Sequence, residues 1–355
     1  MKILFDGPYQ SVPKSGVLLY FNLLAREFAR SNIIYFSRTY SKSNQCNGVS
    51  TPEFKHYRPH KLFFRLEYIW FKFFGPKHFD VVHTIEYSLS PIGRYFVKKG
   101  AKHVITIYDL IHEILGAPPN LYNKIIREKF YKECDGLLFI SNSTKHDFNK
   151  FYPEFTSYPN SVTYLASKYT QSSIPTYKSR KPNSVYAGSR EGYKNFNLAL
   201  KIFSSILVEL PNAKLIVCGS PPNENEKNIA QNIKNSLKWI SFPSDDELKD
   251  IFLDSFALLY TSSYEGFGLP LLEAMSNGCI PVARNHSSIP EVMGDAGVLL
   301  NNDNVENTTK DLIQIFQNTE KHEIILQSGF KQASKFFWSK TASDTMIFYK
   351  SLLKT

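Results

Sequence analysis

The segment A-L-L-Y-T-S-S-Y-E-G-F-G-L-P-L-L-E-A-M-S-N-G-C-I-P-V-A, residues 257–283, decides the fold. An apolar run at 257–260 leads into a glycine-bearing loop, then an amphipathic stretch, then a second apolar run at 280–283. Pro270 fits the first turn of a helix, where a missing N–H loses no partner. Gly278 suits the position just past a helix end. The segment therefore predicts a strand, a helix and a second strand parallel to the first.

The same alternation of strand and helix patterns runs through the whole chain. Apolar runs predict strands at 2–5, 33–36, 81–83, 104–108, 136–140, 185–187, 214–218, 239–242, 257–260, 280–283 and 297–300, with helical patterns at 17–30, 195–209, 245–253 and 338–353. Such alternation is typical of α/β proteins in which helices cover both faces of a parallel sheet. A chain of 355 residues is long enough for two domains. A Pro-, Ser- and Asn-rich stretch at 156–183 predicts the boundary, giving domains at 1–170 and 171–338.

Composition narrows the class of protein. The four cysteines, Cys46, Cys134, Cys218 and Cys279, form no C-x-x-C pair, which argues against a zinc site or disulfide framework and favours a reducing compartment. The first residues do not predict a signal peptide, and no long uncharged apolar stretch predicts a membrane span.

The net positive charge lies in the first half of the chain. Residues 1–170 hold 23 Lys and Arg against 13 Asp and Glu, whereas residues 171–355 hold 19 of each. A basic half favours an anionic partner such as lipid head groups or a phosphorylated acceptor, and charge that serves only solubility is the alternative. No recognised module supports nucleic acid as the partner.

The loop Glu265-Gly266-Phe267-Gly268, followed by Leu269, predicts a ligand site. It places backbone N–H groups at a helix N-terminus beyond a parallel strand, where α/β sheets bind ligands and where negative charge is favoured. Yet Glu265 and Glu273 would repel phosphate, while suiting hydroxyl groups. A ligand that carries both a diphosphate and diols, such as a sugar nucleotide, satisfies both features. Glu265 would then face the sugar and Glu273 the ribose.

A second loop, G-S-R-E-G-Y-K-N at residues 188–195, brings two cations to the end of another strand. Gly188 allows a tight turn, and Arg190 and Lys194 are expected to face the diphosphate. Fixed cations there would stabilise the charge of a leaving nucleoside diphosphate without a metal. An ordinary charged surface loop is the alternative. Near the N-terminus, Gly16 would let the backbone approach a phosphate, unless Ser15 is only a helix cap.

No metal site is expected. The dense acidic cluster Asp245-Asp246-Glu247 follows Ser244, and Ser244 with Glu247 forms a capping-box pattern, so the cluster is interpreted as structural. No histidine pair has helical metal-binding spacing. No cofactor is therefore predicted beyond the substrate itself.

These motifs resemble glycosyltransferase family 4 over nearly the whole chain. The E-x7-E string at 265–273, the I-P-E-V motif at 289–292 and the F-W-S-K-T-A motif at 337–342 match the family pattern, and S-G-V at 15–17 resembles its first glycine motif. The resemblance implies a GT-B fold, with two Rossmann-like domains facing a central cleft and a C-terminal helix, residues 339–355, packing back on the N-terminal domain. It also implies retaining hexosyl transfer, with the N-terminal domain binding the acceptor and the C-terminal domain the donor.

Two further motifs, G-S-R-E-G-Y-K-N-F from residue 188 and T-I-Y-D-L-I-H-E from residue 106, look most like bacterial O-antigen and polysaccharide mannosyltransferases. That likeness implies GDP-mannose or a GDP-deoxyhexose such as perosamine as donor and a lipid-linked saccharide as acceptor. Many relatives carry His where Tyr108 stands, so Tyr108 or His112 is expected to touch the transferred sugar. A UDP-sugar enzyme of the same fold and a two-lobed binding protein without catalysis are the alternatives.

The aromatic and basic stretch at 60–79 has two interpretations. Lys61, Arg65 and Lys72 alternate with many aromatic residues, which is typical of a helix that rests on an anionic membrane. A core helix with snorkelling cations is the alternative. The membrane interpretation predicts a cytoplasmic protein held peripherally on the inner face of the cytoplasmic membrane.

Overall fold

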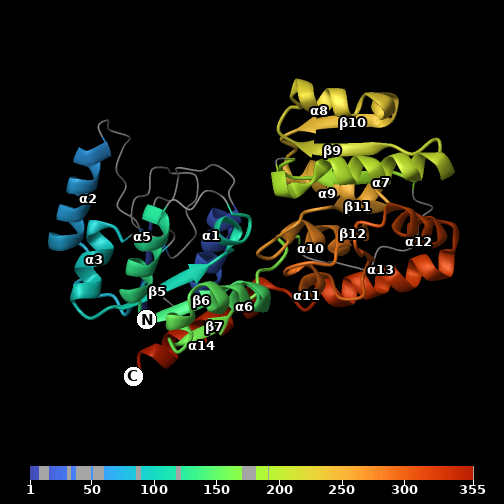
Figure 1. Ribbon diagram of the computed structural model, residues 1–355. Coiled ribbons are helices and arrows are strands. Elements are labelled where there is room, and N and C mark those ends of the chain that lie inside the picture. Colours follow the sequence, from blue (N-terminus) through green and yellow to red (C-terminus); the bar gives the residue numbers. More distant parts are fainter. Residues whose placement is uncertain are drawn as a thin grey trace. The chain divides into compact units, whose positions relative to one another are not determined.

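In the computed structural model, two parallel sheets organise the chain (Figure 1). The structure describes residues 1–7, 16–29, 33–36, 49–50, 60–84, 89–116, 121–169, 181–190 and 192–354, with the backbone alone at 16, 18, 19, 33, 36, 49, 50, 60–65, 67 and 121–123. The chain divides into two units, one made of residues 1–165 and 338–355 and the other of residues 166–337. The boundaries predicted from the sequence, after residues 170 and 338, lie five residues and one residue later than those of the structure, after residues 165 and 337.

The first unit contains a seven-stranded sheet of order β3-β2-β1-β4-β5-β6-β7 in which all pairs are parallel. Its strands are β1 (Lys2–Asp6), β2 (Ile33–Phe36), β3 (Val49–Ser50), β4 (Val81–Thr84), β5 (Lys102–Ile107), β6 (Gly136–Phe139) and β7 (Asn160–Val162). Its helices are α1 (Gly16–Phe28), α2 (His60–Phe73), α3 (Pro91–Lys98), α4 (Ile111–Ile114), α5 (Leu121–Lys132), α6 (Asn142–Phe151) and α14 (Trp338–Leu352), with the 3₁₀ turn η2 (Pro153–Phe155).

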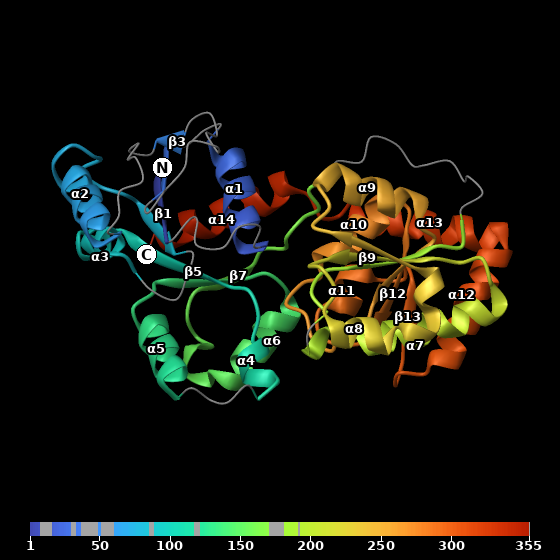
Figure 2. The same ribbon diagram turned by 90° about the horizontal axis from the view of Figure 1, so that it is seen from above.

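Strand side chains alternate between the two faces of this sheet, as the period of two requires. Leu4 and Val82 point into an apolar cluster with residues of α3, α5 and α6. Phe5 and His83 point the other way, toward α1 and α14, where His83 contacts Phe21 and Tyr349. Figure 2 shows α1 and α14 on one face and α4, α5 and α6 on the other.

Helix α14 completes the first unit although it lies at the far end of the chain. It packs along α1 and β7. Gly136 in β6 makes room for it, because a Cβ at this position would lie 2.6 Å from Cζ of Phe348 and 2.9 Å from Cδ1 of Leu352. The Thr341 hydroxyl donates to the Tyr164 carbonyl at 2.6 Å. The predicted return of the last helix to the N-terminal domain is therefore present.

The second unit contains a six-stranded sheet of order β10-β9-β8-β11-β12-β13, again with all pairs parallel. Its strands are β8 (Ser184–Ala187), β9 (Leu215–Gly219), β10 (Leu237–Ser241), β11 (Ala257–Tyr260), β12 (Ile280–Arg284) and β13 (Val298–Leu300). Its helices are α7 (Phe196–Glu209), α8 (Glu224–Ile229), α9 (Asp245–Asp254), α10 (Leu269–Ser276), α11 (Ile289–Met293), α12 (Val305–Gln317) and α13 (Thr319–Ala333), with the 3₁₀ turns η3 (Gly192–Lys194) and η4 (Gln231–Ser236).

Helices cover both faces of this second sheet. In Figure 2, α7, α8 and α12 lie on one side, and α9, α10 and α13 lie on the other. The chain moves outward from β8 through β9 to β10, then returns to pair β11 with the opposite side of β8. The strand order therefore reverses between β8 and β11. Open α/β sheets bind ligands beyond the carboxyl ends of the strands at such a reversal.

Candidate functional site

The two predicted ligand loops lie at that reversal point of the second sheet. The loop carrying Lys194 follows β8, and the loop carrying Glu265 follows the neighbouring strand β11. The Lys194 ammonium donates to Oε1 of Glu265 at 2.6 Å. Both side chains are mostly shielded from solvent. The structure thus brings these two residues, 71 positions apart in the chain, into direct contact.

The backbone around Lys194 is fixed by hydrogen bonds from both strands. The Thr261 hydroxyl, just after β11, donates to the carbonyls of Lys194 and Asn195 at 3.2 and 2.9 Å. The Tyr186 hydroxyl, in β8, donates to the Lys194 carbonyl at 3.3 Å. Asn195 itself has a left-handed backbone with φ of 50°, which lets α7 begin immediately after the loop. These hydrogen bonds therefore fix the backbone from which the Lys194 side chain extends.

The Glu265 loop is held by two serines that follow β12. The Ser287 hydroxyl accepts from the Glu265 N–H at 3.0 Å. The Ser288 hydroxyl donates to the carbonyls of Glu265 and Phe267 at 2.8 and 3.0 Å. Gly268 then begins helix α10 with φ of 100°, a conformation that strains any residue with a Cβ. The glycine at this position is thus required by the turn into the helix.

Helix α10 has the ends that the sequence predicts. Pro270 lies in its first turn, and no hydrogen bond from a described side chain caps its N-terminus. Gly278, just past the helix, has φ of 66°. The N-terminal end of α10 thus carries the partial positive charge of a helix start beside the Lys194–Glu265 pair.

Tyr260, the last residue of β11, adds a buried phenol to this site. Burial and the charge of Glu265 raise the pKa of Tyr260 well above its ordinary value, and the two side chains share a hydrogen bond. The phenol therefore remains protonated and donates to the carboxylate. Glu265 consequently has both a cationic and a neutral donor, with lone pairs left for a ligand hydroxyl.

Arg190 forms an ion pair with Glu226 in α8. Its guanidinium, 2% exposed, donates through Nε to Oε1 of Glu226 at 2.8 Å and through Nη2 to Oε2 at 3.1 Å. Nη2 also donates to the Ser220 carbonyl at 2.8 Å. Although burial opposes it, the hydrogen bond from Arg190 lowers the pKa of Glu226. Arg190 therefore joins the loop after β8, which begins at Gly188, to the loop after β9, and does not face Lys194 and Glu265.

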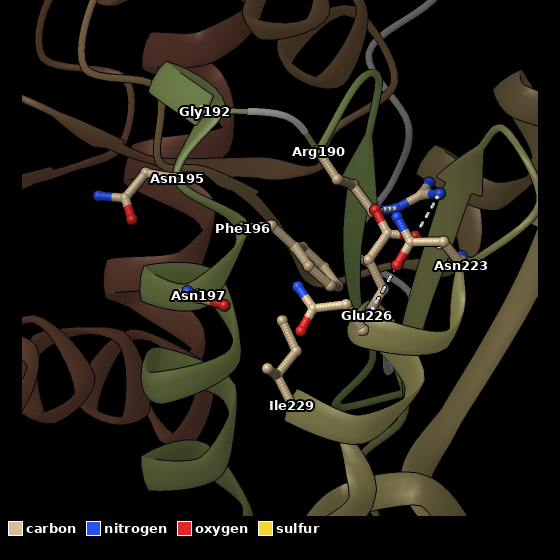
Figure 3. A pocket seen from close by; sticks show the side chains of 9 residues that line it. Arg190, Gly192, Asn195, Phe196, Asn197, Asn223, Glu226 and Ile229 are labelled. Carbon is tan, nitrogen blue, oxygen red and sulfur yellow. Dashed lines mark hydrogen bonds and ion pairs between the residues drawn. The ribbon is translucent and has the colours of Figure 1, made fainter.

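A pocket of about 360 Å³ adjoins the Arg190–Glu226 pair, between the starts of α7 and α8 (Figure 3). In Figure 3 the two charged side chains meet at one side of the pocket, and Phe196 points toward them from α7. The remaining lining includes Gly192 and several asparagines: Asn195, Asn197, Asn223 and Asn225. Neither Glu265 nor Glu273 lines this pocket.

Glu273 lies one turn into α10 and is almost buried. The ammonium of Lys168 lies 3.7 Å from its Oε1 and 2.5 Å from Oδ1 of Asp245, at the start of α9. Burial raises the pKa of Glu273 to about 7, while Lys168 opposes this rise. Little water reaches this carboxylate, so a bound ligand with hydroxyl groups would supply the hydrogen bonds that solvent does not.

The residues predicted in the first unit lie at the edges of its strands and helices. Helix α1 begins at Gly16, whereas Ser15 lies outside the described residues. Tyr108 directly follows β5, and its half-buried ring packs edge-on against Tyr20 at 5.9 Å between centroids. His112 lies in the short helix α4 and is exposed. Tyr108 thus occupies the carboxyl end of a central strand and His112 does not.

The acidic cluster at 245–247 has the predicted structural role at its first turn. The Ser244 hydroxyl accepts from the Glu247 N–H, and Glu247 accepts from the Ser244 N–H, so the capping box is present. Within the described part of the chain, no group of three or more His, Cys, Asp or Glu residues could hold a metal ion. The described cysteines, at positions 134, 218 and 279, are free and buried.

Sequence reasoning missed the residues that support the predicted ones. Lys168, Glu226, Ser287 and Ser288 all contact predicted site residues. Each is separated from its partner by 21 or more positions. The Ser-Ser pair just after a predicted strand was the one local signal, because it stands at the same edge of the sheet as Glu265.

Comparison with known proteins shows which class of enzyme the chain resembles. Residues 169–332 match the family model described as Glycosyl transferases group 1. An O-antigen chain mannosyltransferase B from Escherichia coli is 28% identical over 174 residues, covering 48% of this chain and 46% of that protein. The GDP-mannose:cellobiosyl-diphosphopolyprenol alpha-mannosyltransferase of Komagataeibacter xylinus is 27% identical over 187 residues, covering 49% and 47%. The chain thus spans about half the length of these curated relatives.

Solved structures identify the fold. Sucrose-phosphate synthase from Thermosynechococcus elongatus aligns with a TM-score of 0.73 at 13% identity, over 99% of this chain and 98% of that one. The fold is the predicted GT-B fold, with two parallel sheets. Residues 169–332 match the group 1 glycosyltransferase model, and curated mannosyltransferases of O-antigen synthesis are among the relatives, as the predicted resemblance implies.

Proposed function

We propose that this protein is a retaining glycosyltransferase that moves a hexose from a nucleoside diphosphate sugar to a saccharide acceptor. The contact between Lys194 and Glu265 carries the proposal, because it places a cation and a hydroxyl-binding carboxylate together at the strand reversal. The nearby N-terminus of α10 favours a negatively charged group. The carboxylate of Glu273 stands one turn further along the same helix and suits a ribose diol.

Each group has a role in the transfer. An ammonium has three hydrogens, so Lys194 can keep its contact with Glu265 and also bind a phosphate oxygen. Glu265 accepts from hydroxyls of the transferred sugar. As the bond from the anomeric carbon to the phosphate breaks, the acceptor oxygen bonds to the same face and its proton passes to the departing phosphate oxygen. Lys194 and the start of α10 stabilise the charge that develops there, without a metal.

Arg190 supports the donor site through its position. Its ion pair with Glu226 fixes the backbone of the loop that ends in Lys194, so the loop is formed before a donor arrives. The loop's backbone and Gly188 then stand beside the diphosphate.

We propose a GDP-linked donor, either GDP-mannose or a GDP-deoxyhexose such as perosamine. The names of the relatives from Escherichia coli and Komagataeibacter xylinus, both mannosyltransferases, support this choice. Isothermal titration with GDP and UDP tests it. Tighter binding of GDP is expected; tighter binding of UDP would move the assignment to the UDP-sugar alternative, and binding of either without donor hydrolysis or transfer would favour a non-catalytic protein.

Transfer that requires Mg²⁺ or Mn²⁺ after treatment with EDTA would contradict the metal-free mechanism.

The outer face of helix α2 supports a lipid-linked acceptor. Leu66, Ile69 and Phe73 are exposed by 43%, 45% and 60%, and their spacing places them on one face of the helix; Phe74, directly after α2, is 77% exposed. Phe71, on another face, is buried in the core of the first unit. The buried face fits the core-helix interpretation of the 60–79 stretch, and the exposed face supports the membrane interpretation. No helix among the described residues is long and apolar enough to span a membrane.

We propose that this face rests on the anionic inner surface of the cytoplasmic membrane, where the excess Lys and Arg of residues 1–170 add attraction. Sedimentation with vesicles tests the proposal. Binding to vesicles that contain phosphatidylglycerol should weaken with added salt and should fall sharply in Phe73→Ser/Phe74→Ser. The matched double variant Val208→Ser/Ile324→Ser, which removes exposed apolar side chains from the second unit, should bind like the wild type. Equal sedimentation with neutral and anionic vesicles would overturn it.

A further inference from the structure

Lys168 is a largely shielded cation that connects the start of the second unit to its donor-site carboxylate. Its ammonium lies between Asp245, at 2.5 Å, and Glu273, at 3.7 Å. The Lys168 side chain is 17% exposed and that of Glu273 10%, whereas Asp245 is 73% exposed. The neighbouring residue, Tyr169, donates its hydroxyl to the Asp245 backbone carbonyl at 2.9 Å. The segment is thus fastened to the start of α9 at two adjacent positions.

The two carboxylates differ in what they need from the ammonium. Asp245 is exposed, so water stabilises its charge and its contact with Lys168 serves mainly to fix the lysine. Glu273 has little access to water, and removing a carboxylate from water favours its protonated form. Among the titratable groups that face Glu273, which are Lys168, Tyr169 and Asp245, only Lys168 favours the ionised carboxylate.

We propose that Lys168 is a positioning residue for the donor: its ammonium keeps the Glu273 carboxyl ionised and oriented to accept the ribose hydroxyls, while Asp245 anchors the ammonium. This inference rests on the proposed function, because it assumes that Glu273 binds the nucleotide. It adds a residue from outside both ligand loops to the donor site.

The geometry predicts how nucleotide binding changes with pH. With Lys168 in place, the pKa of Glu273 is about 7, so the carboxylate is populated at neutral pH. Without the ammonium, burial and Asp245 act unopposed and the pKa of Glu273 rises further. A protonated Glu273 has lost part of its acceptor capacity for a diol. Binding should then weaken at neutral pH and recover only in more alkaline solution, where Glu273 ionises without help.

The test is the pH profile of GDP affinity, measured by isothermal titration from about pH 6 to about pH 9.5 (with UDP in its place if the wild type prefers UDP). Lys168→Met should bind about fivefold more weakly than wild type near pH 7, about tenfold more weakly near pH 6 and within about twofold at the alkaline end, as expected if the midpoint of the profile moves by about one unit. Lys168→Arg should restore the wild-type midpoint.

Lys181→Met is the matched control. Lys181 also pairs with an aspartate of α9, Asp254, at 3.8 Å, but both side chains are exposed. This variant should reproduce the wild-type profile. Melting temperatures of all four proteins confirm that each is folded under the conditions used.

The possible outcomes distinguish a failure of this inference from a failure of the proposed function. Failure of the wild type to bind either nucleotide would remove the proposed function. If the wild type binds and Lys168→Met loses affinity equally at every pH, Lys168 supports only the local structure and the inference is overturned. An unchanged profile in Lys168→Met would overturn it as well.

Discussion

Two shielded polar clusters, one in each unit, differ in their charge. In the first unit, the His83 ring hydrogen-bonds on one side with the Tyr349 hydroxyl at 2.6 Å and on the other with the Thr106 hydroxyl at 2.7 Å. Burial lowers the pKa of His83 to about 3, so this network is neutral at physiological pH. At the strand reversal of the second unit, by contrast, the shielded side chains of Lys194 and Glu265 are charged and paired.

The difference indicates what each set of groups does. The neutral network joins β4, β5 and α14 inside a core, where satisfied hydrogen bonds rigidify a fold. The charged pairs stand at the carboxyl ends of β8 and β11, and buried ion pairs contribute little net stability because desolvation offsets their attraction. Their position at a ligand-binding edge instead favours recognition of a charged substrate. Variants in the two units should therefore separate activity from stability.

The largest expected effect is on transfer, in Lys194→Met. Removing a fixed cation from the site where leaving-group charge develops should lower kcat by roughly 10²–10³-fold. Donor-hydrolysis and transfer assays measure it, with Lys201→Met, an exposed lysine of α7, as the control. A loss smaller than about fivefold would exclude the catalytic role of Lys194.

A smaller effect is expected for Glu273→Gln, and it is a gain in the free energy of unfolding. The pKa of Glu273 rises from 4.5 to about 7 on folding, so the folded state binds a proton more readily and stability is lost as the pH rises through this window. Glutamine removes that cost. The variant should gain up to about 3 kcal/mol in free energy of unfolding near pH 8 and almost nothing near pH 4. Urea denaturation at both pH values measures the gain, and equal gains at both would contradict the pKa. Nucleotide binding should be lost.

The smallest effect is expected for Tyr349→Phe, which leaves one nitrogen of His83 without its hydrogen bond. The free energy of unfolding should fall by about 1–2 kcal/mol near pH 7, while kcat stays unchanged. Urea denaturation and the transfer assay measure these two quantities. Tyr35→Phe, whose ring packs against Phe71 and Phe79, serves as the control for loss of a hydroxyl. A large loss of activity in Tyr349→Phe would break the separation between the two units.

Local sequence patterns predict most of the fold, because the central strands are continuous apolar runs. All eleven predicted strands are present, and β2 and β11 have the predicted bounds. The edge strands β3 and β7 were missed. The sequence of β7 is Asn-Ser-Val, and β3 is a Val-Ser pair, so both form by pairing with a neighbouring strand and not from their own apolar content.

The sequence predicts the contact between Lys194 and Glu265 at the candidate site, but it does not predict the residues that surround this contact. Strand order places Lys194 beside Glu265, because β8 and β11 are neighbours in the sheet and the loops at their carboxyl ends therefore meet. The direction of the Arg190 side chain depends on Glu226, 36 positions away, and nothing local distinguishes a guanidinium that faces phosphate from one that faces a carboxylate. Lys168 reaches Glu273 from a segment that sequence analysis assigned to the domain boundary.

The return of α14 to the first unit affects the order in which the chain can fold during synthesis. Residues 166–337 form a continuous stretch and can complete their sheet as soon as they leave the ribosome. Residues 1–165 are made earlier, yet the face of their sheet that carries Phe5 and His83 lacks α14 until residues 338–352 have been synthesised. The first unit is therefore begun before the second unit and completed after it, and its aromatic surface remains available to chaperones throughout that interval.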